Sequence, residues 1–172
     1  MDKSVWIAQA VDNLSCCGPQ GQEAADYLHR KHTRIGFTRQ KNSAARWTPI
    51  GWVILNARQY SPQTPADDPF LLCTLLHEVH HLRQGMLTAL SVYGELDAWQ
   101  VGFRFYYELT GKPVDPRLSE LLSLPLTYDR PMLRRVRTLM QGYAGKGYRV
   151  DLLPLLPLHR EIGWHLGSRS NA

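Results

Sequence analysis

The stretch from Asp68 to Gly85 constrains this chain more than any other, because its ends and its composition together predict one buried helix. Asp68 can cap the first turn, Pro69 suits the first helical position, and Gly85 can end the helix. The residues between them are nearly all apolar, so the helix should lie inside the protein. Histidines within such a helix need polar partners, and a metal ion supplies one.

Inside this helix, the sequence His77-Glu78-Val79-His80-His81 places two histidines four residues apart, with a glutamate directly after the first. Residues four apart lie above one another on one helix face, so His77 and His81 can converge on one cation. Glu78 lies about 100° around the helix, near that cation without binding it. His80 points away from the pair and is expected to pack or to support a ligand. The alternative is two core histidines bonded to backbone carbonyls, with Glu78 on the surface.

A third ligand is expected from a second long helix, predicted from about Thr88 to Leu109. Glu95, Ala98 and Gly102 share one face of this helix. The small residues allow a close approach to the neighbouring helix, so the carboxylate of Glu95 can reach both histidines. Asp97 lies about 200° away on the same helix and is therefore not chosen.

Two alternatives for the third ligand stay open. Acidic residues usually lie on the surface, so Glu95 can instead face solvent. His159 and His165, near the C-terminus, are rival ligands.

Two neutral imidazoles and one carboxylate hold a tetrahedral zinc ion with its fourth position open for water, which is the form of a catalytic site. Glu78, beside that water, can take its proton and pass it to a leaving amine. Nitrogen and oxygen ligands without thiolate favour one Zn²⁺ per chain, although manganese, cobalt or iron can enter such a site.

The pattern His77-Glu78-x-x-His81, with Glu95 on the following helix, resembles the HExxH zincin metallopeptidase superfamily, in particular a compact, gluzincin-like (minimal zincin) member. The similarity covers about residues 51–102. It implies that His77, His81 and Glu95 bind zinc and that Glu78 is the catalytic base. The expected function is therefore that of a zinc-dependent endopeptidase acting on a polypeptide substrate.

Further features of the resemblance lie around the motif. A glutamine shortly after the second histidine, here Gln84, is also similar to what small zincins have at this place. By the same resemblance, the strand Trp52–Asn56 is expected to be the edge strand that pairs with extended substrate. Trp99 stands where many gluzincins have an aspartate that holds a zinc-binding histidine, so that support must come from elsewhere, such as a backbone carbonyl, Thr74 or Asp97. The residue that stabilises an oxyanion stays open among Tyr93, Tyr106, Tyr107, Tyr128 and Arg104.

The whole chain, residues 1–172, is expected to form a single α+β, predominantly helical, zincin-like domain, with its core motif region at 51–110 and a mobile tail at 167–172. Residues 34–56 predict a small antiparallel sheet of two to three strands beside the motif helix. Residues 57–68 are predicted as a loop. Further helices are expected at 4–14, 20–32, 115–125 and from Asp129 to about Met140, with irregular connections at 142–148 and 150–158.

The formal net charge of +5 at pH 7 is mild, and most of it can be solvated surface. The basic helix at 130–140, with Arg134, Arg135 and Arg137, is the best candidate to contact an anionic partner. The alternative function is therefore a non-catalytic zinc-binding regulatory or interaction domain that uses this helix to bind a protein or nucleic acid.

The cysteines indicate a reducing compartment. Cys16 and Cys17 are adjacent and Cys73 lies on the buried helix, so a disulfide framework is not expected. The N-terminus lacks the apolar run of a signal peptide, and no stretch has the apolar length of a membrane helix. We therefore expect a cytoplasmic protein with no membrane partner.

Overall fold

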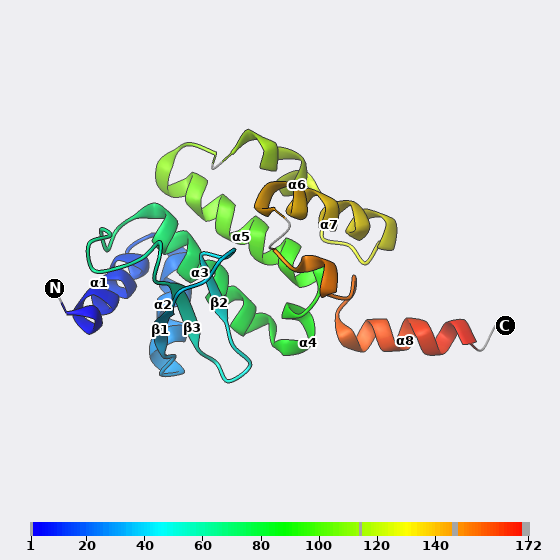
Figure 1. Cartoon of the computed structure of the whole chain (residues 1–172), viewed down its shortest axis with the longest axis horizontal. Coiled ribbons are helices and arrows are strands. Elements are labelled where there is room, and N and C mark those ends of the chain that lie inside the picture. Colours follow the sequence, from blue (N-terminus) through cyan, green and yellow to red (C-terminus); the bar gives the residue numbers. More distant parts are fainter. Residues whose placement is uncertain (1, 114, 146–147, 170–172) are drawn as a thin grey trace.

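The computed structural model describes residues 2–113, 115–145 and 148–169, with side chains described as far as residue 166. Helices dominate and a three-stranded sheet lies beside them, so the predicted α+β, mostly helical fold class is confirmed (Figure 1). The described elements are, in chain order, α1 (Lys3–Ser15), α2 (Gly18–Arg30), β1 (Ile35–Thr38), β2 (Ala45–Trp47), β3 (Val53–Asn56), α3 (Pro69–Gln84), α4 (Met86–Ala89), α5 (Val92–Thr110), α6 (Ser119–Ser123), α7 (Arg130–Ala144) and α8 (Leu158–Arg169), with single 3₁₀ turns η1 (Pro116–Leu118) and η2 (Val150–Leu152).

Helix α3 has the predicted bounds, and its predicted end residues account for them. The carboxylate of Asp68 accepts a hydrogen bond of 2.9 Å from the backbone N–H of Leu71, which satisfies one of the free donors of the first turn. Gly85 ends the helix with a φ of 75°, a conformation that favours glycine. Leu71, Leu75 and Val79 are at most 1% exposed, so α3 is the buried centre of the molecule.

Helix α5 packs along α3, and small residues set how closely the two approach. A Cβ added at Gly102 would lie 3.4 Å from the Cβ of His77 and 3.5 Å from the sulfur of Cys73. The Cys73 thiol donates a hydrogen bond of 3.1 Å to the carbonyl of Gly102. The predicted helix from Thr88 is wrong at its start, because the hydroxyl of Ser91 caps a new helix by accepting from the N–H of Gly94 at 3.0 Å.

The sheet has the order β1-β3-β2 and is mixed. β2 is antiparallel to β3, with Trp47 opposite Val53, but β1 is parallel to β3, with Ile35 opposite Val53. The prediction of a purely antiparallel sheet is therefore wrong for one pair of strands. The physical reason is that β2 forms on the far side of β3, so β3 returns between the two earlier strands and runs in the same direction as β1.

This order also corrects the predicted edge strand. Both sides of β3 (Val53–Asn56) are already paired, so no further chain can pair with it. Next to α3 the edge strand is β2, which packs on that helix.

A second apolar cluster lies on the other side of α5 and combines Leu96 of that helix with side chains of α6, α7 and η2, such as Leu121, Val136 and Val150. Both clusters include residues of α5, which therefore lies between them. The predicted helix from Asp129 is present as α7, and 115–125 forms η1 followed by α6.

The C-terminal region differs from the prediction. Residues 150–158 contain η2 and then the first residue of α8, a helix that the sequence did not predict. Its Glu161 forms a salt bridge of 2.9 Å with Arg130 of α7, and α8 projects from the rest of the chain in Figure 1. Of the predicted mobile tail, residues 167–169 end α8, and residues 170–172 lie outside the described residues.

All three cysteines are free thiols, as expected. Within the described ranges, none of the helices combines the length and the apolar character that a membrane crossing requires.

Candidate metal centre

Two imidazoles from α3 and one carboxylate from α5 meet between the two helices. The Nε2 atoms of His77 and His81 are 3.1 Å apart, and Nε2 of His81 lies 3.7 Å from Oε1 of Glu95. All three potential ligand atoms lie within 4.8 Å of one another. The side chain of Glu95 is 14% exposed, so the alternative of a solvated glutamate is wrong. The cluster can hold a metal ion, and the sequence named all three of its residues.

The distances fit a cation between the groups. Two nitrogen ligands at about 2.0–2.1 Å from a tetrahedral ion are about 3.3 Å apart, close to the observed Nε2 separation. A hydrogen bond with the backbone of Ala98 also holds the ring of His77. Nδ1 of His81 faces the side-chain oxygen of Gln84 at 3.1 Å. Nε2 of His81 then presents a lone pair towards His77, and a cation between the two Nε2 atoms would be bound by both imidazoles.

Burial keeps both imidazoles neutral. It lowers the pKa of His77 to about 3, with a further contribution from the charge of His81. It also lowers the pKa of His81 to about 4, although the hydrogen bond with Gln84 acts in the opposite direction. Neutral imidazole is the form that binds a metal.

Gln84, the last residue of α3, connects the cluster to Asp97. Its amide nitrogen donates to the carbonyl of Gly94 at 3.0 Å and to Oδ2 of Asp97 at 2.8 Å. The same carboxylate oxygen lies 2.7 Å from Nε2 of His80. Burial raises the pKa of Asp97, but the hydrogen bonds from His80 and Gln84 outweigh it and lower the pKa below 3.8. Asp97 therefore supports the cluster through Gln84 and through its charge, which acts directly on His81, and His80 in turn holds that carboxylate.

Tyr148 holds the carboxylate of Glu95, the third potential ligand, in place. Its hydroxyl donates to Oε2 of Glu95 and accepts a hydrogen bond of 2.9 Å from Nε1 of Trp99. Burial and the charge of Glu95 raise the pKa of Tyr148 well above 10, so the hydroxyl keeps its proton. The sequence did not reveal this contact, because Tyr148 is 53 residues from Glu95 and lies in a connection without periodicity.

Glu78 lies beside the cluster without being part of it. It is 5% exposed. Burial and the charge of Glu95 raise its pKa to about 8, while a backbone hydrogen bond from Trp47 of β2 acts in the opposite direction. The predicted surface alternative for Glu78 is therefore wrong, and the carboxyl is positioned by the edge strand.

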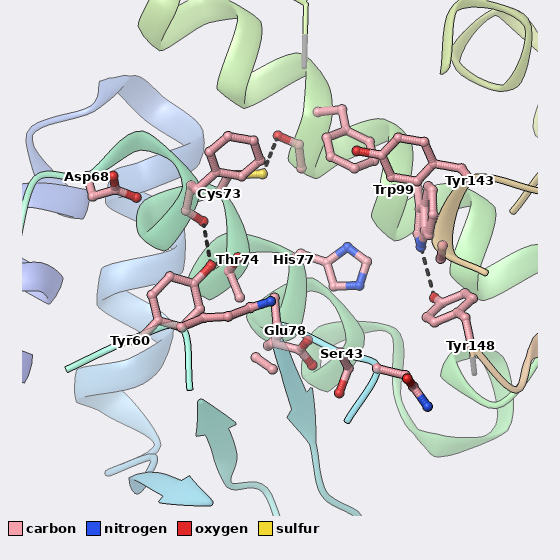
Figure 2. A pocket seen from close by; sticks show the side chains of 18 of the residues that line it. Ser43, Tyr60, Asp68, Cys73, Thr74, His77, Glu78, Trp99, Tyr143 and Tyr148 are labelled. Atoms are coloured by element: carbon pink, nitrogen blue, oxygen red, sulfur yellow. Dashed lines mark hydrogen bonds between the residues drawn. The ribbon is translucent and has the colours of Figure 1, made fainter. Parts of the chain in front are cut away.

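A cleft of about 580 Å³ opens over the cluster, and both His77 and Glu78 line it. Figure 2 shows these two side chains between Tyr60 on one side and Tyr148 on the other. One wall is apolar and consists of Phe70, Cys73, Gly102, Phe103 and Tyr143; the opposite wall is the segment 42–45, which leads into β2.

The edge strand β2 presents backbone groups to this cleft. The carbonyl of Ala44 accepts from Asn56 at 2.8 Å, and the N–H of Thr48 donates to Trp52 at 2.9 Å. Because bonding direction alternates along an antiparallel strand, the backbone groups of Ala45 and Trp47 point away from β3. The N–H of Trp47 bonds to Glu78, and the groups left for a further extended chain on the side of α3 are those of Ala45 and the carbonyl of Trp47.

The rival ligands lie elsewhere. His159 and His165 are exposed on α8, and His165 lies 3.7 Å from Glu161. The five residues considered for an oxyanion do not line the cleft: Tyr93 contacts Tyr128, Tyr106 contacts Phe70, Arg104 bonds to Gln100 and Leu122, and Tyr107 is 55% exposed. Tyr60, Tyr143 and Tyr148 line it instead.

The basic helix α7 directs most of its arginines to partners within the chain. Arg130 pairs with Glu161, Arg135 pairs with Glu120 at 2.8 Å, and Arg137 donates to the carbonyl of Leu153 at 2.6 Å. Carboxylates therefore compensate two of the four arginines of this helix, and a third is held by a backbone carbonyl.

No protein-family model, curated protein or solved structure matches this chain. The resemblance to zincins stays a prediction from the sequence motif.

Proposed function

We propose that this protein is a zinc-dependent metallopeptidase, an HExxH hydrolase that cleaves an extended polypeptide in the cleft over α3 and α5. The proposal depends on one observation: ligand atoms of His77, His81 and Glu95 lie within 4.8 Å of one another, while Glu78 lines the same cleft as His77. Three protein ligands with a separate base beside them suit a catalytic centre, whereas structural zinc sites have four protein ligands.

The donor set favours zinc, held by His77, His81 and Glu95 with one ion per chain. When bound, this ion would supply Lewis-acid activation of a water molecule and of the substrate carbonyl. Gln84 and Tyr148 keep the ligands His81 and Glu95 oriented through their hydrogen bonds.

Glu78 is the group that moves the proton. Burial raises the pKa of its carboxyl, which makes the carboxylate a stronger base than one in water. It accepts a proton from the attacking water and donates it to the leaving nitrogen of the peptide. The backbone N–H of Trp47 holds the carboxylate in place during both transfers.

The substrate is expected to lie along the free edge of β2. The backbone groups of Ala45 and the carbonyl of Trp47 can pair with an extended chain, as one more strand of the sheet, while the N–H of Trp47 stays bonded to Glu78. The cleft between this edge and the apolar wall of α5 is then occupied by substrate side chains.

Metal analysis and casein cleavage by matched variants test this function. The purified protein should contain one equivalent of zinc, lost in His77→Ala and Glu95→Ala. Glu78→Gln should keep the zinc and lose cleavage by at least about a hundredfold, as expected for a general base. Glu108→Gln, an exposed change on the same helix as Glu95, is the control and should keep both.

The alternative of a non-catalytic interaction domain makes the opposite prediction. The protein would bind zinc without cleaving casein, Glu78→Gln would leave its function intact, and neutralising Arg134, Arg135 and Arg137 would remove partner binding with a strong salt dependence. The salt bridge of Arg135 and the hydrogen bond of Arg137 within the chain argue against this alternative.

A further inference from the structure

A second concave surface adjoins the metal cleft and is lined by cations. It has a volume of about 400 Å³ and includes Arg39, Lys41, Arg46 and Arg149. The remaining lining residues are Thr38, Gln40, Asn42, Ser43 and Tyr148, so no carboxylate lines it among the described residues. We name this surface the basic arm.

The basic arm continues directly from the metal cleft. Asn42, Ser43 and Tyr148 line both surfaces, and Tyr148 bonds to the candidate ligand Glu95. Asn42 and Ser43 precede β2, so a chain paired with the free edge of β2 passes from the cleft into the basic arm.

Most cations of the basic arm have no ion pair with the described residues of the chain. Arg39, Lys41 and Arg46 are exposed, and none of them forms an ion pair with the described residues. Arg149 pairs only with the nearby exposed Asp151, at 3.2 Å. These charges contrast with those of α7, where Arg130 and Arg135 both bind carboxylates of the same chain.

The segment that carries these cations is fixed in place. The side chain of Asn56, which is 3% exposed, accepts from the N–H of Gln40 at 3.0 Å and donates to the carbonyl of Ser43 at 2.8 Å. Gln40 in turn donates to the carbonyl of Ile54 at 2.9 Å. The positions of the neighbouring Arg39 and Lys41 backbones are thus set before any partner binds, which lowers the entropic cost of binding.

We infer that the basic arm binds acidic side chains of the polypeptide substrate, a few residues to one side of the bond that the centre cleaves. This inference rests on the proposed function for the identity of the substrate. An acidic peptide fits better than a nucleic acid, because the cations line one short concavity that continues a groove for extended chain. Continuous contact with a phosphate backbone uses a longer basic stripe.

Binding without turnover tests the inference. The probe is a fluorescein-labelled twelve-residue peptide with four consecutive aspartates, and its companion has asparagine in their place. Fluorescence anisotropy is measured with the full-length Glu78→Gln protein. The acidic peptide should bind about tenfold more tightly than its companion, as several exposed ion pairs of modest strength allow. The preference should disappear at high salt.

Matched variants separate the basic arm from the general positive charge of the chain. The triple change Arg39→Gln, Lys41→Gln and Arg46→Gln should remove the preference for aspartate. The control removes the same charge at exposed positions outside the basic arm, through Arg30→Gln, Lys112→Gln and Arg134→Gln, and should retain the preference. Thermal unfolding of both triple variants checks that each is folded.

The results that would overturn the inference are specific. They are equal binding of the two peptides, no measurable binding of either, or a preference that survives the triple change in the basic arm. Tighter binding of a labelled single-stranded oligonucleotide, lost in the same triple variant, would overturn it in favour of nucleic acid. None of these binding measurements requires hydrolysis. A failure to cleave casein would therefore contradict the proposed function, whereas the measured preference for the acidic peptide would still test the basic arm.

Discussion

The side-chain oxygen of Gln84 lies 3.1 Å from Nδ1 of His81, and this contact determines which nitrogen of His81 can bind a metal. The amide nitrogen of Gln84 faces the carbonyl of Gly94 and the carboxylate of Asp97, which can only accept hydrogen bonds. The amide oxygen must therefore face His81. Nδ1 of His81 then carries the proton, and Nε2 presents a lone pair to the cluster.

The first expectation follows from this contact. Gln84→Met keeps the size of the side chain but removes the acceptor, so the proton of His81 is no longer held on Nδ1. Zinc affinity should fall about 10- to 100-fold, as changes of this kind typically cause. Competition with a chromophoric chelator measures the affinity, and the absorption spectrum of the cobalt-substituted protein reports the ligand geometry.

A change in stability alone would not produce this result. Gln22→Met, on the exposed face of α2, is the control and should leave zinc affinity unchanged. If folded Gln84→Met binds zinc as tightly as the unchanged protein, the contact does not orient His81.

Tyr148 provides a second expectation, on the side of Glu95. Tyr148→Phe removes the hydroxyl that donates to the buried carboxylate of Glu95, and the N–H of Trp99 loses one of its two acceptors, since it also bonds to Glu95. Loss of a hydrogen bond that leaves a buried group unpaired costs about 1–3 kcal/mol, so the free energy of unfolding should fall by that amount. Urea unfolding measures it. Tyr107→Phe, at a residue 55% exposed, should have no measurable effect, and an equal loss in both variants would contradict the interpretation.

The three residues of the candidate metal centre could be predicted from the sequence because the patterns that identify them are local. His77 and His81 lie on one helix, and the residues that begin and end this helix, Asp68 and Gly85, are its direct neighbours in the sequence. The choice of Glu95 needed only one further step, since small residues on the same face of α5 allow close packing against α3.

The parts that were missed depend on long-range contacts. β3 (Val53–Asn56) has the composition of a strand whether it lies at an edge or in the centre, and only the pairing order shows that β2 is the edge. The contact of Tyr148 with Glu95 spans 53 residues, and α8 is joined to α7 by the pairing of Glu161 with Arg130 rather than by a continuous apolar stripe.

Asn56 leads to a third expectation, concerning the segment between β1 and β2. Its buried amide bonds to the backbone of Gln40, Ser43 and Arg58, at distances from 2.8 to 3.2 Å. Asn56→Ala leaves these backbone groups without partners, so unfolding free energy should fall by about 2–4 kcal/mol. Limited proteolysis should also cut near residues 39–44 before other sites. The exposed Asn42→Ala is the control, and similar stability of the two variants would show that this anchor is unimportant.

The pairing of Glu161 with Arg130 gives a fourth expectation: the stability of the docking of α8 on the rest of the chain should depend on pH. The hydrogen bonds from Arg130 lower the pKa of Glu161 below 4.5, despite a smaller opposing effect of burial. A carboxyl whose pKa is lower in the folded state contributes stability that is fully present above its unfolded pKa, near 4.5, and is lost as pH falls through the folded value. Glu161→Gln removes this contribution, so it should destabilise the docking of α8 at pH 7, and the effect should shrink as the pH falls below 4.5 through the folded pKa.

Hydrogen exchange of the α8 amides in the unchanged and Glu161→Gln proteins, at pH 7 and at acidic pH with correction for intrinsic exchange rates, measures this difference. Nε of Arg130 is buried without a hydrogen-bond partner among the described residues, so loss of the carboxylate leaves this guanidinium still less compensated. The matched control is Glu108→Gln on α5, which should not alter α8 at either pH. A difference between Glu161→Gln and the unchanged protein that is as large near pH 3 as at pH 7 would mean that the charge of Glu161 does not hold the helix.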